Sequence, residues 1–208
     1  MVAGKKSSCP GAQVALENLL AGNQRFVRGE RAPRSFDLRR EKLVAGQKPQ
    51  AIILGCSDSR VSPGTLFDQN LGEIFVVRTA GQVLGSSVLA SIEYAVDHLQ
   101  APLFMILGHE KCGAVTAAIA HEGQAQGNIG ALLGQIQPAI ERARQLNTGP
   151  DNMVEKVTDL HLEELAKQVL QESDIISQAV AEGRLRLITA KYQIASGEVK
   201  IHAPDFRG

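Results

Sequence analysis

Two apolar stretches decide the fold of this chain: AIILGC at residues 51–56 and LFMILG at residues 103–108. Both are short aliphatic runs bounded by Gly, Pro or polar residues, as is typical of buried β-strands. Similar runs occupy residues 74–78 and 185–190. The sequence therefore predicts four buried strands, and polar side chains directly follow the two quoted ones.

Segments of helical spacing separate these runs. They occupy residues 86–99, 112–121, 129–146 and 155–182, the last with a break near Ser173. The alternation predicts an α/β fold in which helices flank a mainly parallel central β-sheet. Residues 197–202 are expected to add a short extra edge strand, and the Gly- and Gln-rich residues 122–128 to form a loop.

The N-terminal part is expected to form a helix followed by an arm. Apolar residues between Val14 and Val27 follow a loose helical spacing, and Gly29 is a natural end. Residues 31–49 are polar and interrupted by Pro, which favours an arm that contacts a partner subunit. The 208 residues fit a single domain, with the helix and arm at 1–49 and an α/β catalytic core at 50–208.

Composition narrows the possible partners and compartments. Lys and Arg number 22, as do Asp and Glu, so no basic excess favours nucleic-acid binding. The longest apolar runs are far shorter than the roughly 20 residues that span a bilayer, so no membrane contact is expected. No secretory signal pattern follows Lys5 and Lys6, and three cysteines are too few for a disulfide framework. We therefore expect a cytoplasmic protein.

The reactive side chains follow the two quoted strands. Cys56, Asp58 and Arg60 come at the end of the first, and His109 and Cys112 at the end of the second. The carboxyl ends of neighbouring parallel strands are where ligand sites form in such sheets. Two thiolates and one imidazole are zinc ligands, and a site with three protein ligands keeps an open position, as catalytic zinc does. Asp58 and Arg60 can in addition form a bidentate pair.

Simpler interpretations exist for each half of this pattern. A buried Cys at a strand end often only packs. A structural zinc site needs a fourth ligand, and the remaining thiol is Cys9. Neither possibility requires the Asp-x-Arg sequence, so its presence beside both motifs favours a catalytic site. The other histidines have no second ligand at a useful spacing and are expected at the surface or at helix ends: His98, His121, His161 and His202.

Four motifs make the sequence resemble the β-class carbonic anhydrases: CSDSRV at 56–61, GEIFVVRTAG at 72–81, SIEYAV at 91–96 and LGHEKCGAV at 107–115. Looser matches, LLAGNQRFVRG and AKYQIASGEVKI, extend the resemblance over nearly the whole chain. It implies a zinc-dependent lyase that reversibly hydrates carbon dioxide to bicarbonate and a proton. In that reaction zinc lowers the pKa of its water, and the resulting hydroxide attacks the substrate. The resemblance also implies a homo-oligomer, either a dimer or a larger even assembly.

The resemblance also assigns roles to residues. Zn²⁺ would be bound by Cys56, His109 and Cys112, and Asp58 and Arg60 would form the catalytic pair. Without its partner, Asp58 would itself become a zinc ligand and close the site. Further positions match the family's substrate site, which is built partly by the neighbouring subunit: Gln47, Phe75, Ala80, Tyr94 and Gly113. Spacing alone would equally suit core positions for the two aromatic residues and a connector position for the glutamine.

One departure from the family pattern leads to a separate prediction. A subgroup has an inhibitory bicarbonate site with a Trp, an Arg and a Tyr, and the corresponding positions here are Ile53, Arg78 and Tyr192. We expect that site to be absent or altered. Two alternative functions remain on the same residues. One is hydrolysis of a carbon dioxide analogue, carbonyl sulfide or carbon disulfide; the other is a non-catalytic zinc or redox-sensing module.

Overall fold

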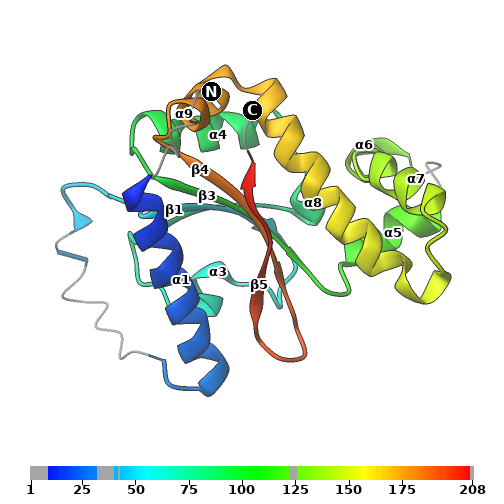
Figure 1. Cartoon of the computed structure of the whole chain (residues 1–208), viewed down its shortest axis with the longest axis horizontal. Helices are drawn as coiled ribbons and strands as arrows, with labels where there is room; N and C mark the ends of the chain where they lie inside the picture. The colour runs from blue at the N-terminus through cyan, green and yellow to red at the C-terminus, as the bar shows by residue number, and fades with distance from the viewer. Residues whose placement is uncertain (1–8, 32–39, 42, 122–125, 207–208) are drawn as a thin grey trace, which may run out of the picture.

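The computed structural model describes residues 9–31, 40–41, 43–121 and 126–206. Its centre is a five-stranded sheet (Figure 1). In spatial order the strands are β2 (Ile74–Thr79), β1 (Ala51–Cys56), β3 (Leu103–His109), β4 (Arg186–Tyr192) and β5 (Val199–Phe206). The first four are parallel, and β5 runs antiparallel to β4. The predicted α/β class, with an extra edge strand, is confirmed.

The two stretches that decided the prediction form the middle of the sheet. Every residue of β1 and β3 is buried, because helices cover both faces there. Alternate residues of a strand point to opposite faces. Thus Ile52 packs in one core with α4 (Ser86–Asp97), α8 (Met153–Glu172) and α9 (Asp174–Ala181). Its neighbour Ile53 packs in a second core with the N-terminal helix.

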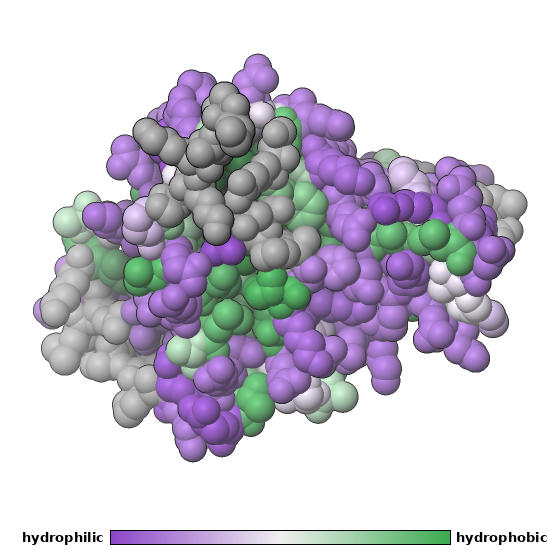
Figure 2. Space-filling view, viewed as in Figure 1, coloured by the Kyte–Doolittle hydropathy of each residue, from purple (hydrophilic) through white to green (hydrophobic). Residues whose placement is uncertain are grey.

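That N-terminal helix is α1 (Pro10–Arg28), and it ends at Gly29 as predicted. Gly29 has a φ of 71°, a left-handed conformation that glycine adopts without steric cost. The short α3 (Pro63–Leu66), which was not predicted, lies on the same face of the sheet (Figure 1). Figure 2 shows this side of the molecule as largely hydrophilic, with apolar side chains gathered between α1 and β5.

A third core lies beyond the carboxyl ends of the strands. It joins α5 (Gly113–His121), α6 (Gly127–Gly134) and α7 (Gln137–Gln145) to the first turns of α8, and both Cys56 and Cys112 are part of it. In Figure 1 these helices form a lobe beside the sheet. The lobe therefore supplies the wall against which the candidate ligands pack.

Two helix predictions differ from the structure. The predicted helix 129–146 is broken into α6 and α7 at residues 135–136, because Pro138 lacks the N–H that a continuous helix would need and instead lies in the first turn of α7. Within the predicted loop 122–128, residues 122–125 lie outside the described part, and α6 already begins at Gly127. The predicted break near Ser173 is confirmed, since its hydroxyl caps α9 by accepting from the Ile176 N–H.

Short 3-10 turns at Ala80–Gln82 (η1) and Pro150–Asn152 (η2) complete the described elements. Among the described residues, no helix combines the length and apolar character needed to cross a membrane.

Candidate metal centre

Three of the predicted ligands converge at the carboxyl end of the sheet. Cys56 ends β1, His109 ends β3, and Cys112 stands immediately before α5. One ligand atom from each lies within 4.8 Å of the others, and all three residues are buried. The convergence follows from topology, since β1 and β3 are adjacent parallel strands whose carboxyl ends lie side by side.

The His109 ring is oriented for a ligand. Its Nδ1 is 2.8 Å from the Glu110 carbonyl oxygen, so Nδ1 carries the hydrogen and donates it. The lone pair of Nε2 then faces the two thiols, and this buried atom has no hydrogen-bond partner among the described residues. A buried polar atom without a partner is costly, and a cation at this point would satisfy it.

The thiols of Cys56 and Cys112 act together as a pair of candidate metal ligands. A hydrogen bond from the Cys112 thiol lowers the pKa of Cys56, although burial opposes this, and the Gly81 N–H adds to the lowering. The same contact with Cys56, together with burial, raises the pKa of Cys112. A soft divalent cation can replace the shared proton and bind both sulfurs as thiolates. The donor set of two sulfurs and one nitrogen therefore fits zinc.

Asp58 and Arg60 form the predicted pair beside this cluster. Arg60 Nε donates to Asp58 Oδ1 at 2.9 Å, and Arg60 Nη2 donates to Asp58 Oδ2 at 2.7 Å. These bonds hold the pKa of Asp58 well below its usual range. Asp58 Oδ2 is also 3.9 Å from His109 Nε2, so the carboxylate lies next to the ligand cluster while both of its oxygens are bound by Arg60.

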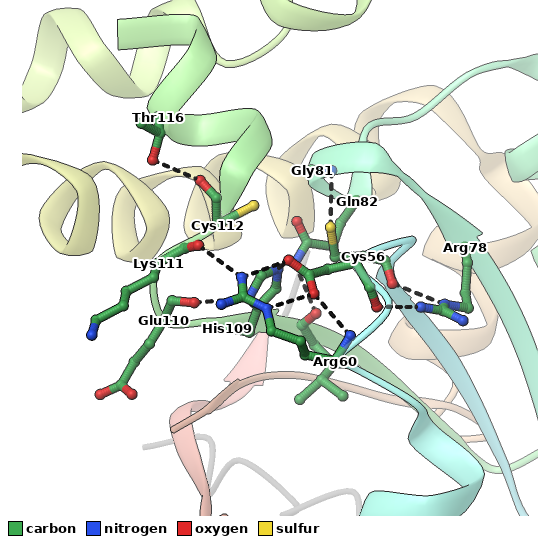
Figure 3. Close-up of polar contacts among 12 residues, drawn as sticks. Cys56, Arg60, Arg78, Gly81, Gln82, His109, Glu110, Lys111, Cys112 and Thr116 are labelled. Carbon is green, nitrogen blue, oxygen red and sulfur yellow. Dashed lines mark hydrogen bonds and ion pairs between the residues drawn. The ribbon is translucent and has the colours of Figure 1, made fainter. Parts of the chain in front are cut away.

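Backbone contacts fix the segment that carries this pair, residues 56–60, which we name the first ligand loop. Arg78 on β2 donates from Nε to the Cys56 carbonyl at 2.8 Å and from Nη2 to the Asp58 carbonyl at 2.7 Å (Figure 3). The Gly81 N–H points at Cys56 Sγ at 3.4 Å. Gly81 has a φ of 69°, and a Cβ there would meet Ala114 and Ile136 at 3.1 Å, so this close approach requires glycine.

The second ligand loop, residues 109–112, is held from α8. Glu155 Oε1 accepts a hydrogen bond from the Lys111 N–H at 2.9 Å. The Lys111 carbonyl accepts from Arg60 Nη2 at 3.2 Å, so Arg60 bridges the two loops (Figure 3). No pattern in the sequence points to Glu155, because it follows Lys111 by 44 residues and lies on a charged helix.

The structure corrects two predictions, one for a histidine and one for a cysteine. His161 does not lie at the surface or at a helix end: it is 2% exposed in the middle of α8, and its Nε2 is 2.8 Å from the Gly81 carbonyl. Within one chain Cys9 cannot be a fourth ligand, because its Sγ lies 3.4 Å from the Arg184 carbonyl, just before β4 begins. The cluster is at the opposite end of the strands, so the structural zinc alternative that used Cys9 is wrong.

The predicted substrate-site positions fall into two groups. Ala80 follows Thr79, which pairs with Cys56, and Gly113 follows Cys112, so both adjoin the cluster. Gln47, Phe75 and Tyr94 do not. Gln47 is exposed before β1, and Phe75 pairs with Ile52, about 13 Å along the strand from the first ligand.

Tyr94 lies with Phe75 rather than with the cluster. The two ring centroids are 6.4 Å apart, and Tyr94 is 46% exposed. Within one chain these aromatic residues and Gln47 therefore lie away from the ligands. Any role in a substrate pocket requires a second copy of the chain, as the resemblance implied.

Comparisons with known proteins agree with this geometry. A family model described as carbonic anhydrase matches residues 51–199. The chain is 40% identical over 188 residues to carbonic anhydrase 2 of Mycobacterium tuberculosis, covering 88% of this chain and 89% of the relative. It is 38% identical over 193 residues to a carbonic anhydrase of Mycolicibacterium smegmatis, covering 91% and 92%.

Solved structures show the same similarity. A β-carbonic anhydrase of Coccomyxa superposes with a TM-score of 0.71 at 29% identity, covering 77% of this chain and 75% of that one. One of two β-carbonic anhydrases of Sordaria macrospora, described as tetrameric, gives a TM-score of 0.72 at 26% identity, covering 91% and 94%.

Proposed function

Because this chain belongs to the β-carbonic anhydrase family, as its motifs predicted, we propose that it catalyses the reversible hydration of carbon dioxide to bicarbonate and a proton. The observation that carries the proposal is the convergence of two thiols and the His109 Nε2 lone pair beside a carboxylate held by Arg60. The relatives quoted above are named carbonic anhydrases, which favours this reaction over hydrolysis of a sulfur analogue and over a non-catalytic module.

We assign the metal as Zn²⁺, bound by Cys56, His109 and Cys112. When bound with one position open, zinc lowers the pKa of water toward neutrality and so supplies a nucleophile. The buried setting of the three residues keeps bulk water from competing for the ligand atoms. The hydrogen bond from His109 Nδ1 to the Glu110 carbonyl keeps Nε2 free of hydrogen, as metal binding requires.

Asp58 and Arg60 orient the reacting water. With the metal bound, an Asp58 oxygen would accept a hydrogen bond from that water and would so aim a water lone pair at the carbon of the substrate. Arg60 stabilises this arrangement, because two parallel hydrogen bonds fix both the position and the rotation of the Asp58 carboxylate. Without Arg60, Asp58 is free to turn onto the metal and block the open position.

The substrate pocket is completed by a second copy of the chain. The N–H of Gly113, at the start of α5, and the small side chain of Ala80, which follows the strand partner of Cys56, adjoin the cluster. Gln47, Phe75 and Tyr94 of the partner copy supply an amide donor and an apolar wall. The exposure of Tyr94, and of Val76 on the edge strand β2 at 39%, supports a homo-oligomer that covers this face.

We further propose a cytoplasmic location. The two thiols of the metal centre are buried and unpaired, and thiols persist as metal ligands in a reducing compartment.

Stopped-flow measurement of carbon dioxide hydration by the zinc-loaded protein, from about pH 6.5 to 9, tests the reaction. We expect activity that rises with pH. Asp58→Asn, which keeps the shape of the side chain, is expected to retain zinc and lose about 10²-fold or more in rate. If folded, zinc-loaded protein hydrates no carbon dioxide anywhere in this range, the proposed reaction is refuted.

The proposed homo-oligomer is tested separately, by sedimentation at micromolar concentration.

A further inference from the structure

Glu155 contacts the metal centre without touching a ligand side chain. It lies in the first turn of α8, and its Oε1 accepts from the Lys111 N–H at 2.9 Å. Lys111 stands between His109 and Cys112 and has a φ of 51°. A non-glycine residue in this left-handed region is strained, so an external contact helps to hold the conformation. Glu155 provides that contact.

Lys111 transmits this constraint to the catalytic pair. While its N–H is bound by Glu155, its carbonyl accepts from Arg60 Nη2 at 3.2 Å, and the same Nη2 donates to Asp58 Oδ2. A change in the Lys111 backbone would therefore displace the two flanking ligands and remove one of the anchors of Arg60. Arg60 in turn determines whether Asp58 stays beside the metal site or turns toward it.

Glu155 is itself fixed in place from the sheet. Its Oε2 is 2.7 Å from Lys191 Nζ on β4, and Lys191 is also 2.9 Å from Asp159 Oδ1. The Lys191 side chain is only 14% exposed, so this ion pair is partly shielded from solvent. Burial alone would raise the pKa of Glu155, but the hydrogen bonds from Lys191 and from the Lys111 N–H lower it. A charged carboxylate makes the stronger bond to a backbone N–H.

We propose that Glu155 is a positioning residue of the metal centre: through the Lys111 backbone it holds the second ligand loop and Arg60 in the arrangement that binds the metal and keeps Asp58 off it. Its effect on turnover rests on the proposed carbonic anhydrase activity. Its effect on the metal does not depend on that activity and is measured separately.

The test compares Glu155→Ala and Glu155→Gln with a matched control, Asp159→Asn. Asp159 is the other carboxylate on Lys191, one helical turn away, and it makes no contact with the ligand loop among the described residues. The readouts are the rate at which zinc-loaded protein releases metal to a chelator, the visible absorption spectrum of the Co²⁺-substituted protein, and carbon dioxide hydration. Circular dichroism establishes that each variant is folded.

We expect Glu155→Ala to release zinc about 10- to 100-fold faster than the wild type, the usual effect of losing a partner beyond the ligands. Its Co²⁺ spectrum should change, because the ligand geometry changes, and hydration should fall by a similar factor. Glu155→Gln keeps an acceptor oxygen for the Lys111 N–H and should lie between Glu155→Ala and the wild type. Asp159→Asn should match the wild type in all three readouts.

The proposal is wrong if folded Glu155→Ala, or Glu155→Gln where the alanine variant does not fold, releases metal at the wild-type rate with an unchanged Co²⁺ spectrum. It is also wrong if Asp159→Asn has effects equal to those of Glu155→Ala, because the ion pair with Lys191 would then explain them. Should the wild type bind zinc and fail to hydrate carbon dioxide, the proposed function fails, while metal release and the spectrum still decide the role of Glu155.

Discussion

The two ligand loops are held by side chains of opposite charge that come from different layers of the fold. On the first loop, the Arg78 cation donates to two carbonyls from the neighbouring strand β2. On the second, the Glu155 anion accepts from one N–H and belongs to a helix packed over the sheet. The first loop is therefore fixed by strand pairing, whereas the second depends on how α8 packs. In both loops the hydrogen bonds are made to the backbone, so the ligand atoms stay free for the metal.

Removing a ligand from either loop should have the largest effect. Cys56→Ala and Cys112→Ala each leave two protein ligands, so both variants should lose zinc and nearly all hydration activity. The loss should exceed the ~10- to 100-fold that loss of an outer partner causes. Metal content by atomic absorption and stopped-flow hydration measure it. A variant that keeps full zinc and activity would remove that cysteine from the ligand set.

Removing the Arg78 side chain, which holds the first ligand loop, should have the next largest effect. Arg78→Met keeps the length of the side chain and loses both backbone hydrogen bonds. We expect zinc release about 10- to 100-fold faster and a loss of about 1–3 kcal/mol in the free energy of unfolding, because carbonyls lose their partners. Urea unfolding and chelator assays measure the two effects.

A double variant tests whether the two ligand loops are held independently. Arg60 bridges them, so the effects of Arg78→Met and Glu155→Ala on zinc release should not simply add. Strict additivity of the two changes would mean that the loops are held independently.

The sequence could predict the parts of this site that local chemistry encodes. β1 was predicted to the residue, because a buried parallel strand is a continuous apolar run and Cys56 directly ends it. The Asp58 and Arg60 pair is equally local. Glu155 and His161 were not predicted as part of the site, because their contacts with Lys111 and Gly81 span 44 and 80 residues and depend on the packing of α8. The break between α6 and α7 is encoded locally by Pro138, although the helical spacing of residues 129–146 continues across it.

The first ligand loop is also supported by His161, whose Nε2 lies 2.8 Å from the Gly81 carbonyl. Burial lowers the pKa of His161, and the hydrogen bond to the Gly81 carbonyl and the nearby Glu164 only partly oppose this. The unfolded chain therefore takes up a proton near pH 6.5 that the folded chain does not. Stability should be fully present above this pH and should fall below it, by up to about 1.4 kcal/mol per pH unit from this residue.

Urea unfolding of zinc-loaded wild type and His161→Gln between about pH 5.5 and 7.5 measures this dependence. The variant should be less stable near neutrality and should show a shallower decline toward acid. The matched control is His98→Gln, since His98 has a 64% exposed side chain and should keep the wild-type slope. Equal slopes for all three proteins would show that His161 titrates alike in the folded and unfolded chains.

The smallest effect is expected at the other end of the strands, at Cys9. Its thiol contacts the carbonyl oxygens of Pro102 and Arg184, at the starts of β3 and β4, and a serine hydroxyl can take over the weak donor role of the thiol. Cys9→Ser should therefore keep full zinc content, metal release rate and hydration. Partial loss of zinc would mean that Cys9 reaches a metal centre in another copy of the chain, since within one chain the length of β3 separates it from His109. The two ends of the sheet should thus differ in function as they differ in chemistry, with metal binding confined to the end where both ligand loops are held.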